Sequence, residues 1–176
     1  MIFAHRGDDF VETGSENDLV LGGGGDDLIA SGADDDTVHG GAGDDAILGD
    51  GFIGGRNGDD TIFGDSGDDS VVGDNGEGSR GGDDRISGGS GRDQLYADTF
   101  LVSDFRGGRD VIIGGAANDV LVGGPAFDRG FAGSQQTFDR CFEIEETHNC
   151  ERVSEQPPPQ GLAPVRRLHV LTKPKL

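Results

Sequence analysis

Aliphatic side chains are spaced singly along the first three quarters of the chain, each two positions after an aspartate. They occur at Val11, Val20, Ile29, Val38, Ile47, Ile62, Val71, Ile86, Leu95, Ile112 and Leu121. The residues before each aspartate are rich in glycine, which permits positive φ angles and therefore favours turns. The last three residues of each unit, with the aliphatic residue in the middle, predict a short strand whose central side chain points inward.

A turn and a strand in every nine residues predict a solenoid. With two strands per coil, one coil contains 18 residues. The stacked coils are then expected to form two parallel sheets that face each other, with one row of Val, Ile or Leu from each sheet between them. The predicted fold class is therefore all-β, and the repeats predict that this body occupies residues 1–133.

The composition indicates that such a core cannot stabilise the fold alone. Only 32% of the residues are hydrophobic, and the formal net charge is −20. Residues 1–133 contain 28 acidic and 8 basic residues, whereas residues 134–176 contain six of each. This charge argues against nucleic-acid binding, which needs clustered Lys and Arg, and no apolar stretch is long enough for a membrane span. The composition fits either disorder or a repeat protein stabilised by something other than a large core.

The aspartates that set the phase of the repeat are the candidate metal ligands. They are Asp9, Asp18, Asp27, Asp36, Asp45, Asp60, Asp69, Asp84, Asp93, Asp110, Asp119 and Asp128. Stacked carboxylates would repel one another unless a cation lies between them. Carboxylate and carbonyl oxygens suit Ca²⁺, which takes 6–8 oxygen ligands in flexible geometry. Several bound calcium ions are therefore predicted, with metal binding coupled to folding.

Three units contain the whole repeat: GGGGDDLIA from Gly22, GGAGDDAIL from Gly40 and GGSGRDQLY from Gly88. The repeat resembles the G-G-x-G-x-D-x-U-x nonapeptide of RTX (hemolysin-type) calcium-binding proteins, over about residues 4–130. The resemblance implies a right-handed parallel β-roll, secretion, and folding on contact with extracellular calcium. It also implies that Ca²⁺ lies between the turns of units n and n+2, held by the phased aspartates and by turn carbonyls. Among the complete units the implied turn residues are Gly23, Gly25, Gly41, Gly43, Gly89 and Gly91.

Several units depart from this pattern. Glu16, Asp34, Ala117 and Ala126 replace the fourth-position glycine. His5, Arg56, Asp65, Arg80 and Arg106 occupy the second position. The end units also lack a neighbour on one side, so we expect fewer than twelve complete calcium sites.

The period slips three times, at segments Asp50–Asn57, Asp74–Gly81 and Asp98–Arg106. Each insertion precedes a unit of the same edge on successive coils, so the three are expected to stack on one side. Two interpretations are open. The insertions are enlarged turns that pack locally or supply extra calcium ligands (Asp50, Asp74, Asp98), or they form a ridge that binds an anionic, glycan or cell-surface ligand. Insertions on one face of a repeat protein often bind. The ridge residues would be Phe52, Arg56, Arg80, Phe100, Phe105 and Arg106.

The chain after the repeats is predicted to form a cap and a tail. Residues 134–151 are predicted to cap the last coil, with Phe138, Phe142 and Ile144 covering it. Given the extracellular setting that the resemblance implies, a Cys141–Cys150 disulfide is expected, with two free or metal-binding thiols as the alternative. Residues 152–176 form a Pro-rich, flexible tail. The N-terminal residues lack a signal-peptide pattern, which leaves signal removal, another export route or a fragment as options.

No sequence motif of a zinc protease, a nucleophile elbow or a P-loop occurs, so an enzyme is not expected. The leading hypothesis is an extracellular calcium-binding structural module whose folding depends on Ca²⁺. The alternatives are an adhesion or carbohydrate-binding protein that uses the insertions, or the accessory module of a secreted enzyme. A ladder of Thr across the coils is absent, which disfavours ice binding.

Overall fold

A computed structural model describes residues 1–50, 57–75, 80–99, 106–133, 139–149 and 151–152. These residues form strands and no helix, and accordingly contain no helix that is long and apolar enough to cross a membrane. Sheet A contains β1 (Ile2–Arg6), β3 (Leu19–Gly24), β5 (Thr37–Ala42), β7 (Thr61–Ser66), β9 (Arg85–Ser90), β11 (Val111–Ala116), β13 (Arg129–Phe131) and β15 (Glu146–His148). Sheet B contains β2 (Phe10–Ser15), β4 (Leu28–Ala33), β6 (Ala46–Asp50), β8 (Ser70–Asp74), β10 (Gln94–Asp98), β12 (Val120–Val122), β14 (Arg140–Phe142) and β16 (Glu151–Arg152).

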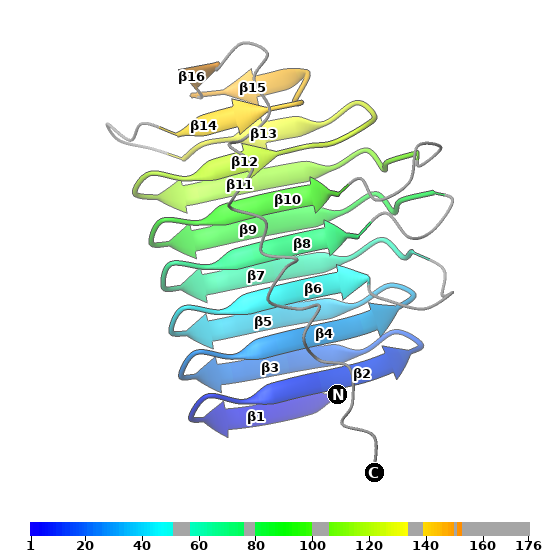
Figure 1. Cartoon of the computed structure of the whole chain (residues 1–176), viewed down its shortest axis with the longest axis vertical. Helices are drawn as coiled ribbons and strands as arrows, with labels where there is room; N and C mark the ends of the chain where they lie inside the picture. Colours follow the sequence, from blue (N-terminus) through cyan, green and yellow to red (C-terminus); the bar gives the residue numbers. More distant parts are fainter. Residues whose placement is uncertain (51–56, 76–79, 100–105, 134–138, 150, 153–176) are drawn as a thin grey trace, which may run out of the picture.

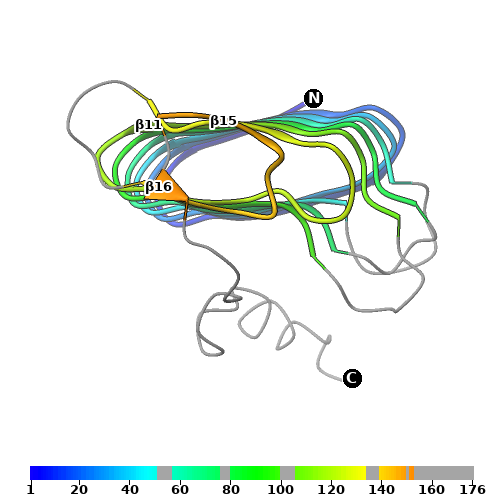
Figure 2. The ribbon, with the colours of Figure 1, turned by 90° about the horizontal axis from the view of Figure 1, so that it is seen from above.

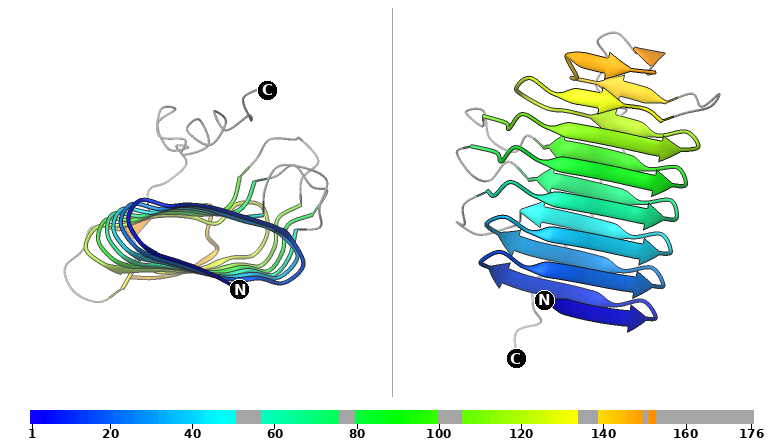
Figure 3. Two further views of the ribbon diagram at one scale, coloured as in Figure 1. Left: turned by 90° about the horizontal axis from the view of Figure 1, so that it is seen from below. Right: turned by 180° about the vertical axis from the view of Figure 1, so that it is seen from behind.

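Consecutive strands alternate between the two sheets, so each strand pairs in parallel with the strand one coil further on (Figure 1). In coils without an insertion the paired residues are 18 apart, as in Val20 with Val38 and Ile29 with Ile47. Seen along the stack, the coils superpose as a flattened ring (Figure 2). The first and last strands lie at opposite ends of the stack (Figure 3). The predicted all-β parallel solenoid with two strands per coil is confirmed.

The core lies between the sheets and consists mainly of the predicted aliphatic residues. Each central strand side chain points inward, and all eleven are at most 6% exposed. They form one continuous cluster along the roll, which Cys141 and Ile144 extend at the C-terminal end. The second inward position of β3, β5 and β11 is glycine, and at Gly22 a Cβ would overlap the Gly40 carbonyl oxygen, so each of these strands contributes one large side chain to the core.

Beyond residue 133 the chain continues both sheets. Strand β13 lacks an aliphatic residue, and a side chain on Gly130 would meet Ile144, which fills the space instead. In strand β14 the Cys141 side chain points into the core. Because side chains alternate along a strand, Phe142 lies on the outward face, where it packs against a second apolar cluster and not on the last coil as predicted. Ile144 therefore covers the last coil as expected, whereas Phe142 does not, and Phe138 lies outside the described residues.

A second apolar cluster lies on the outward face of sheet B. It contains Leu48, Val72, Tyr96 and Val122, each directly after a core residue in its strand. Alternation along a strand places these side chains on the face opposite the core. All four are at most 9% exposed, so this face of β6, β8, β10 and β12 is buried although it faces away from the roll interior.

Two adjacent glycines allow a direct test of how closely the coils approach. Gly25 has φ +124, and a Cβ there would overlap the backbone of Gly7, whereas a Cβ on Gly24 would find only ordinary contact, 3.7 Å from the Ala42 carbonyl oxygen. We expect Gly25→Ala to lower the free energy of unfolding by about 2 kcal/mol or more. Gly24→Ala should stay within about 0.5 kcal/mol of the parent. Thermal unfolding in saturating calcium measures both, and equal losses would contradict this account of the turns.

Candidate metal centre

The phased aspartates form two rows of stacked carboxylates, one at each edge of the roll, called here the inner rows. In each row, the Oδ1 atom of an aspartate accepts the backbone N–H of the aspartate one coil earlier. For example, Asp69 accepts from Asp45 at 2.9 Å, and Asp84 accepts from Asp60 at 2.9 Å. The first inner row contains Asp9, Asp27, Asp45, Asp69, Asp93, Asp119 and Asp139. The second contains Asp18, Asp36, Asp60, Asp84, Asp110, Asp128 and Glu145.

Two members of these rows were not predicted from the sequence. Asp139 accepts the N–H of Asp119 at 2.8 Å, and Glu145 accepts that of Asp128 at 2.8 Å. The nine-residue period had lapsed there, and glutamate is not the repeat's residue. A signal was nevertheless present for Asp139, because it stands two positions before the inward-facing Cys141, as eleven of the twelve phased aspartates stand two positions before an aliphatic residue.

In eleven of the inner-row carboxylates, the other oxygen is buried and has no hydrogen-bond partner among the described residues. Within the described part of the chain, the buried and unpartnered Oδ2 atoms are those of Asp9, Asp27, Asp36, Asp45, Asp60, Asp69, Asp84, Asp93, Asp110, Asp119 and Asp128. From Asp27 onward these side chains are at most 2% exposed. Buried carboxylate oxygens without partners are costly, because charge is poorly solvated away from water. The donor set is therefore suited to a cation with oxygen ligands.

Burial shifts the titration of the inner rows strongly. Loss of solvation is the main cause, and it raises the pKa of Asp45, Asp69 and Asp93 to about 7 and that of Asp60 to about 8. The N–H bond that each carboxylate accepts lowers the pKa and opposes this shift in part. Neighbouring carboxylates raise it further, as Asp69 does for Asp45. The charged form of these groups is thus unfavourable in the roll when no cation is near.

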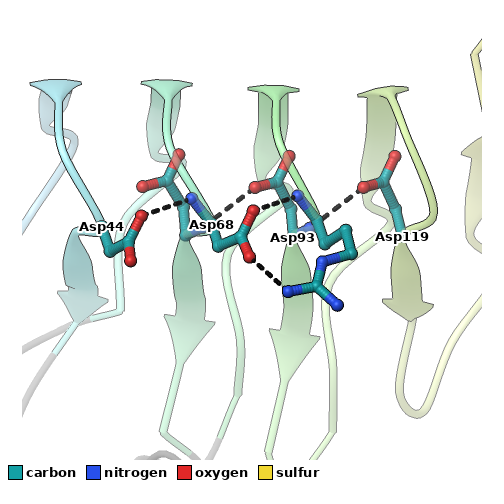
Figure 4. A network of polar contacts seen from close by, with 6 residues as sticks. Asp44, Asp68, Asp93 and Asp119 are labelled. Carbon is teal, nitrogen blue, oxygen red and sulfur yellow. Dashed lines mark hydrogen bonds and ion pairs between the residues drawn. The ribbon is translucent and has the colours of Figure 1, made fainter.

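Exposed residues one position earlier form a second row outside each inner row, in which the hydrogen bonds run the opposite way. Here Oδ1 accepts the N–H of the following coil, so that Asp44 accepts from Asp68 and Asp68 from Arg92, at 2.8 and 2.9 Å (Figure 4). Arg92 also forms an ion pair with Asp68 at 2.8 Å. These outer rows contain Asp8, Asp26, Asp44, Asp68 and Arg92 at one edge and Asp35, Asp59, Asp83 and Arg109 at the other.

The turn glycines adopt the conformation that only glycine takes without strain. Positive φ angles occur at all six predicted turn positions, Gly23, Gly25, Gly41, Gly43, Gly89 and Gly91. A Cβ on Gly41 would overlap the Gly23 carbonyl oxygen, so the turn carbonyls of one coil lie directly against the next. Five non-glycine departures, His5, Glu16, Asp34, Asp65 and Ala117, also have positive φ, whereas Ala126 does not. The left-handed turn conformation is therefore kept in several coils where the sequence pattern is broken, but not in the unit of Asp128.

A family model described as the RTX calcium-binding nonapeptide repeat (4 copies) matches residues 3–38, 21–54, 52–79, 80–99 and 106–129. The chain belongs to the RTX nonapeptide-repeat family. RTX nonapeptide repeats bind multiple Ca²⁺ ions, which accords with the two inner rows. The comparisons with curated proteins and with solved structures returned no match.

The carboxylates of this RTX roll do not form compact metal clusters on their own. Among the described residues, no three His, Cys, Asp or Glu side chains gather in a way that could hold a metal ion. A calcium ion between coils would therefore need backbone carbonyl oxygens as well as inner-row carboxylates. This mixed oxygen set is typical of Ca²⁺ and is unsuited to softer metals.

The insertions of the RTX roll start at one edge, as predicted. Asp50, Asp74 and Asp98 end three successive strands of sheet B and lie in register. Of the six predicted ridge residues, Arg80 and Arg106 are described and exposed. The remaining four, Phe52, Arg56, Phe100 and Phe105, lie outside the described residues, so a ligand-binding ridge stays a prediction.

Of the two cysteines predicted to pair, only Cys141 is among the described residues. Cys141 is 5% exposed in the core. Cys150 lies outside the described residues, so its pairing with Cys141 stays a prediction. The tail beyond Arg152 also lies outside them.

Proposed function

We propose that this protein is a structural module that folds when calcium binds between its coils, and that it works outside the cell. The observation that carries the proposal is the pair of inner rows, with eleven buried Oδ2 atoms that have no partner among the described residues. Leaving so many carboxylate oxygens buried and uncompensated would oppose folding. A divalent cation at these oxygens removes that penalty.

The inner-row carboxylates and the turn carbonyls would hold the calcium ions. Bound calcium supplies positive charge against a chain whose formal net charge is −20. Each inner aspartate keeps its Oδ1 atom engaged with a backbone N–H, which fixes the side chain and leaves Oδ2 available. Because the unfolded chain has no such site, the binding free energy becomes folding free energy.

An extracellular role follows from this coupling. Extracellular calcium modules work with dissociation constants of about 10⁻⁴–10⁻³ M, far above resting cytosolic calcium. The chain would therefore remain unfolded until it reaches a calcium-rich compartment. The proposed Cys141–Cys150 disulfide belongs to the same oxidising setting. We propose no catalytic role, because similar carboxylates recur in successive coils and no single coil is distinguished by them.

Far-UV circular dichroism during a calcium titration tests the proposal. In EDTA we expect the β-sheet signal to be largely lost, and to return cooperatively as calcium is added. Magnesium should restore much less of it, because Mg²⁺ demands a tighter octahedral site and gives up its water reluctantly. A signal that is the same in EDTA and in calcium would contradict calcium-dependent folding.

A further inference from the structure

Asp50, Asp74 and Asp98 form a third set of stacked carboxylates, called here the neck column. They end β6, β8 and β10, lie in register on neighbouring strands and are 2%, 0% and 1% exposed. In the coil before Asp50, the same register position is occupied by Gly32, which has φ +113. The neck column therefore lies outside the nonapeptide phase, at the positions where the insertions leave the roll, and its charges interact with those of the second inner row.

The neck column closes the bases of the insertions. Asp50 Oδ2 accepts the N–H of Gly58 at 2.5 Å, and Asp74 Oδ2 accepts that of Gly82 at 2.7 Å. Asp98 differs, because neither of its oxygens has a hydrogen-bond partner among the described residues, and Asp74 Oδ1 has none either. Three carboxylate oxygens at adjacent coils are thus buried and unsatisfied.

The surroundings of the column offer no compensating cation. In the described part of the chain, no Lys, Arg or His forms an ion pair with these three aspartates. Val72 and Tyr96 lie two residues before Asp74 and Asp98, on the same face of sheet B, and belong to the buried apolar cluster. Ionised carboxylates beside an apolar cluster are costly unless they are paired or coordinate a metal.

The free oxygens of Asp98 lie close to other oxygens with which they could share a hard cation. A Cβ on Gly81 would lie 2.6 Å from Asp98 Oδ1 and 2.6 Å from Asp74 Oδ2, the oxygen that accepts the Gly82 N–H, so these two oxygens are at most twice 2.6 Å apart. An ion that contacts two oxygens at about 2.3–2.6 Å spans a similar separation. On the other side, a Cβ on Gly107 would collide with both Asp98 Oδ2 and the Pro125 carbonyl oxygen. Asp98 therefore has one oxygen beside a second carboxylate and the other beside a backbone carbonyl.

We propose that a divalent cation of the calcium class binds at Asp98, between Asp74 and the Pro125 carbonyl, and fastens the bases of the insertions to the roll. The site lies outside the nonapeptide pattern. It uses the same ion as the proposed function and borders the second inner row, because the charge of Asp98 interacts with that of Asp110. The two proposals are separated by Asp98→Asn, which removes the ligand of this site and leaves every phased aspartate in place. Its ion would also join successive coils at the edge where their loops are longest.

Terbium luminescence provides a local test, because the chain contains one tyrosine and no tryptophan. Tyr96 lies two residues from Asp98 on the same strand face, so Tb³⁺ bound at Asp98 should be excited through Tyr96. We expect Asp98→Asn to abolish most of the tyrosine-sensitised emission and to reduce the calcium stoichiometry, measured by isothermal titration calorimetry, by one ion per chain. The matched control is Asp26→Asn, an exposed outer-row residue at the other edge, which should change neither.

Circular dichroism in saturating calcium separates ion loss from misfolding. Unchanged emission and stoichiometry in a folded Asp98→Asn chain would overturn the site. If that variant does not fold, Asp74→Asn replaces it, since an asparagine oxygen can still accept the Gly82 N–H. Loss of folding in both variants would also overturn the proposal and leave the column a purely structural role. Failure of the proposed function would show instead in the parent chain, as a fold that is insensitive to EDTA.

Discussion

In EDTA, the calcium-free chain should regain much of its β-sheet signal when the pH is lowered from about 8 to about 5. Acid is expected to substitute for calcium because protonation neutralises the inner rows. Burial raises the pKa of Asp45, Asp69 and Asp93 to about 7 and that of Asp60 and Asp110 to about 8. In the unfolded chain these groups titrate near the ordinary value of 3.8.

The direction in which stability changes with pH follows from proton linkage. Between about pH 4 and 8 the folded, calcium-free roll binds more protons than the unfolded chain, so its stability falls as the pH rises. The stabilisation is complete below the unfolded pKa and is lost as the pH passes through the raised values of the folded state. With calcium present the dependence reverses, because ligand carboxylates must be deprotonated to bind the ion.

Circular dichroism as a function of pH, with EDTA and with calcium, measures both dependences. A parallel series at pH 8 with increasing NaCl controls for general repulsion, because salt screens exposed charges much more than buried ones. If salt alone restores the fold as well as acid does, the buried rows are not the cause. A calcium-free chain that loses β-structure on acidification would contradict the assignment outright.

The second large effect is a loss of calcium affinity on substitution of Asp69, compared with the adjacent Asp68, whose environment is the opposite. Asp69 is 1% exposed in an inner row, with a free Oδ2, whereas Asp68 is exposed and paired with Arg92. We expect Asp69→Asn to weaken calcium binding about tenfold or more, roughly 1.4 kcal/mol, because the neutral amide is a poorer ligand. In EDTA at pH 8 the same change should stabilise the roll, since it removes a buried charge.

Asp68→Asn is the matched control. Both variants remove one negative charge, and both asparagines keep an oxygen that can accept the inter-coil N–H. Because the Asp68–Arg92 pair is exposed, its loss should leave the free energy of unfolding nearly unchanged with or without calcium. Calcium titration calorimetry and thermal unfolding measure both variants. Equal effects at the two positions would show that total charge, and not burial in the inner row, governs calcium binding.

The main features of the fold were predictable because one physical period controls them. A single inward side chain such as Ile47 in every nine residues determines the strand, its face and the number of residues per coil. The phased aspartates were found for the same reason, since all but Asp128 stand two positions before an aliphatic residue. Position alone was therefore sufficient to predict both the core row and most of the inner rows.

The parts that the sequence did not predict depend on contacts between coils. Nothing local distinguishes Glu145 as a member of an inner row, because its role comes from the N–H of Asp128, one coil earlier. The outward direction of Phe142 depends likewise on which of two neighbours faces the core, and Cys141 takes that place. The neck column was anticipated as one set of possible extra ligands, but its burial and its free oxygens appear only when the three strands are placed side by side.

The pairing of each strand with the next coil determines how the roll responds to force. Each coil is bonded only to the coils before and after it, and β1 and β16 lie at opposite ends of the stack. A pull on these two ends therefore loads the bonds between coils one interface at a time. Each regular coil that peels away releases 18 residues, or about 60 Å of extended chain. With calcium bound between the coils as proposed, the stack would be an extensible tether whose resistance to pulling depends on the calcium concentration.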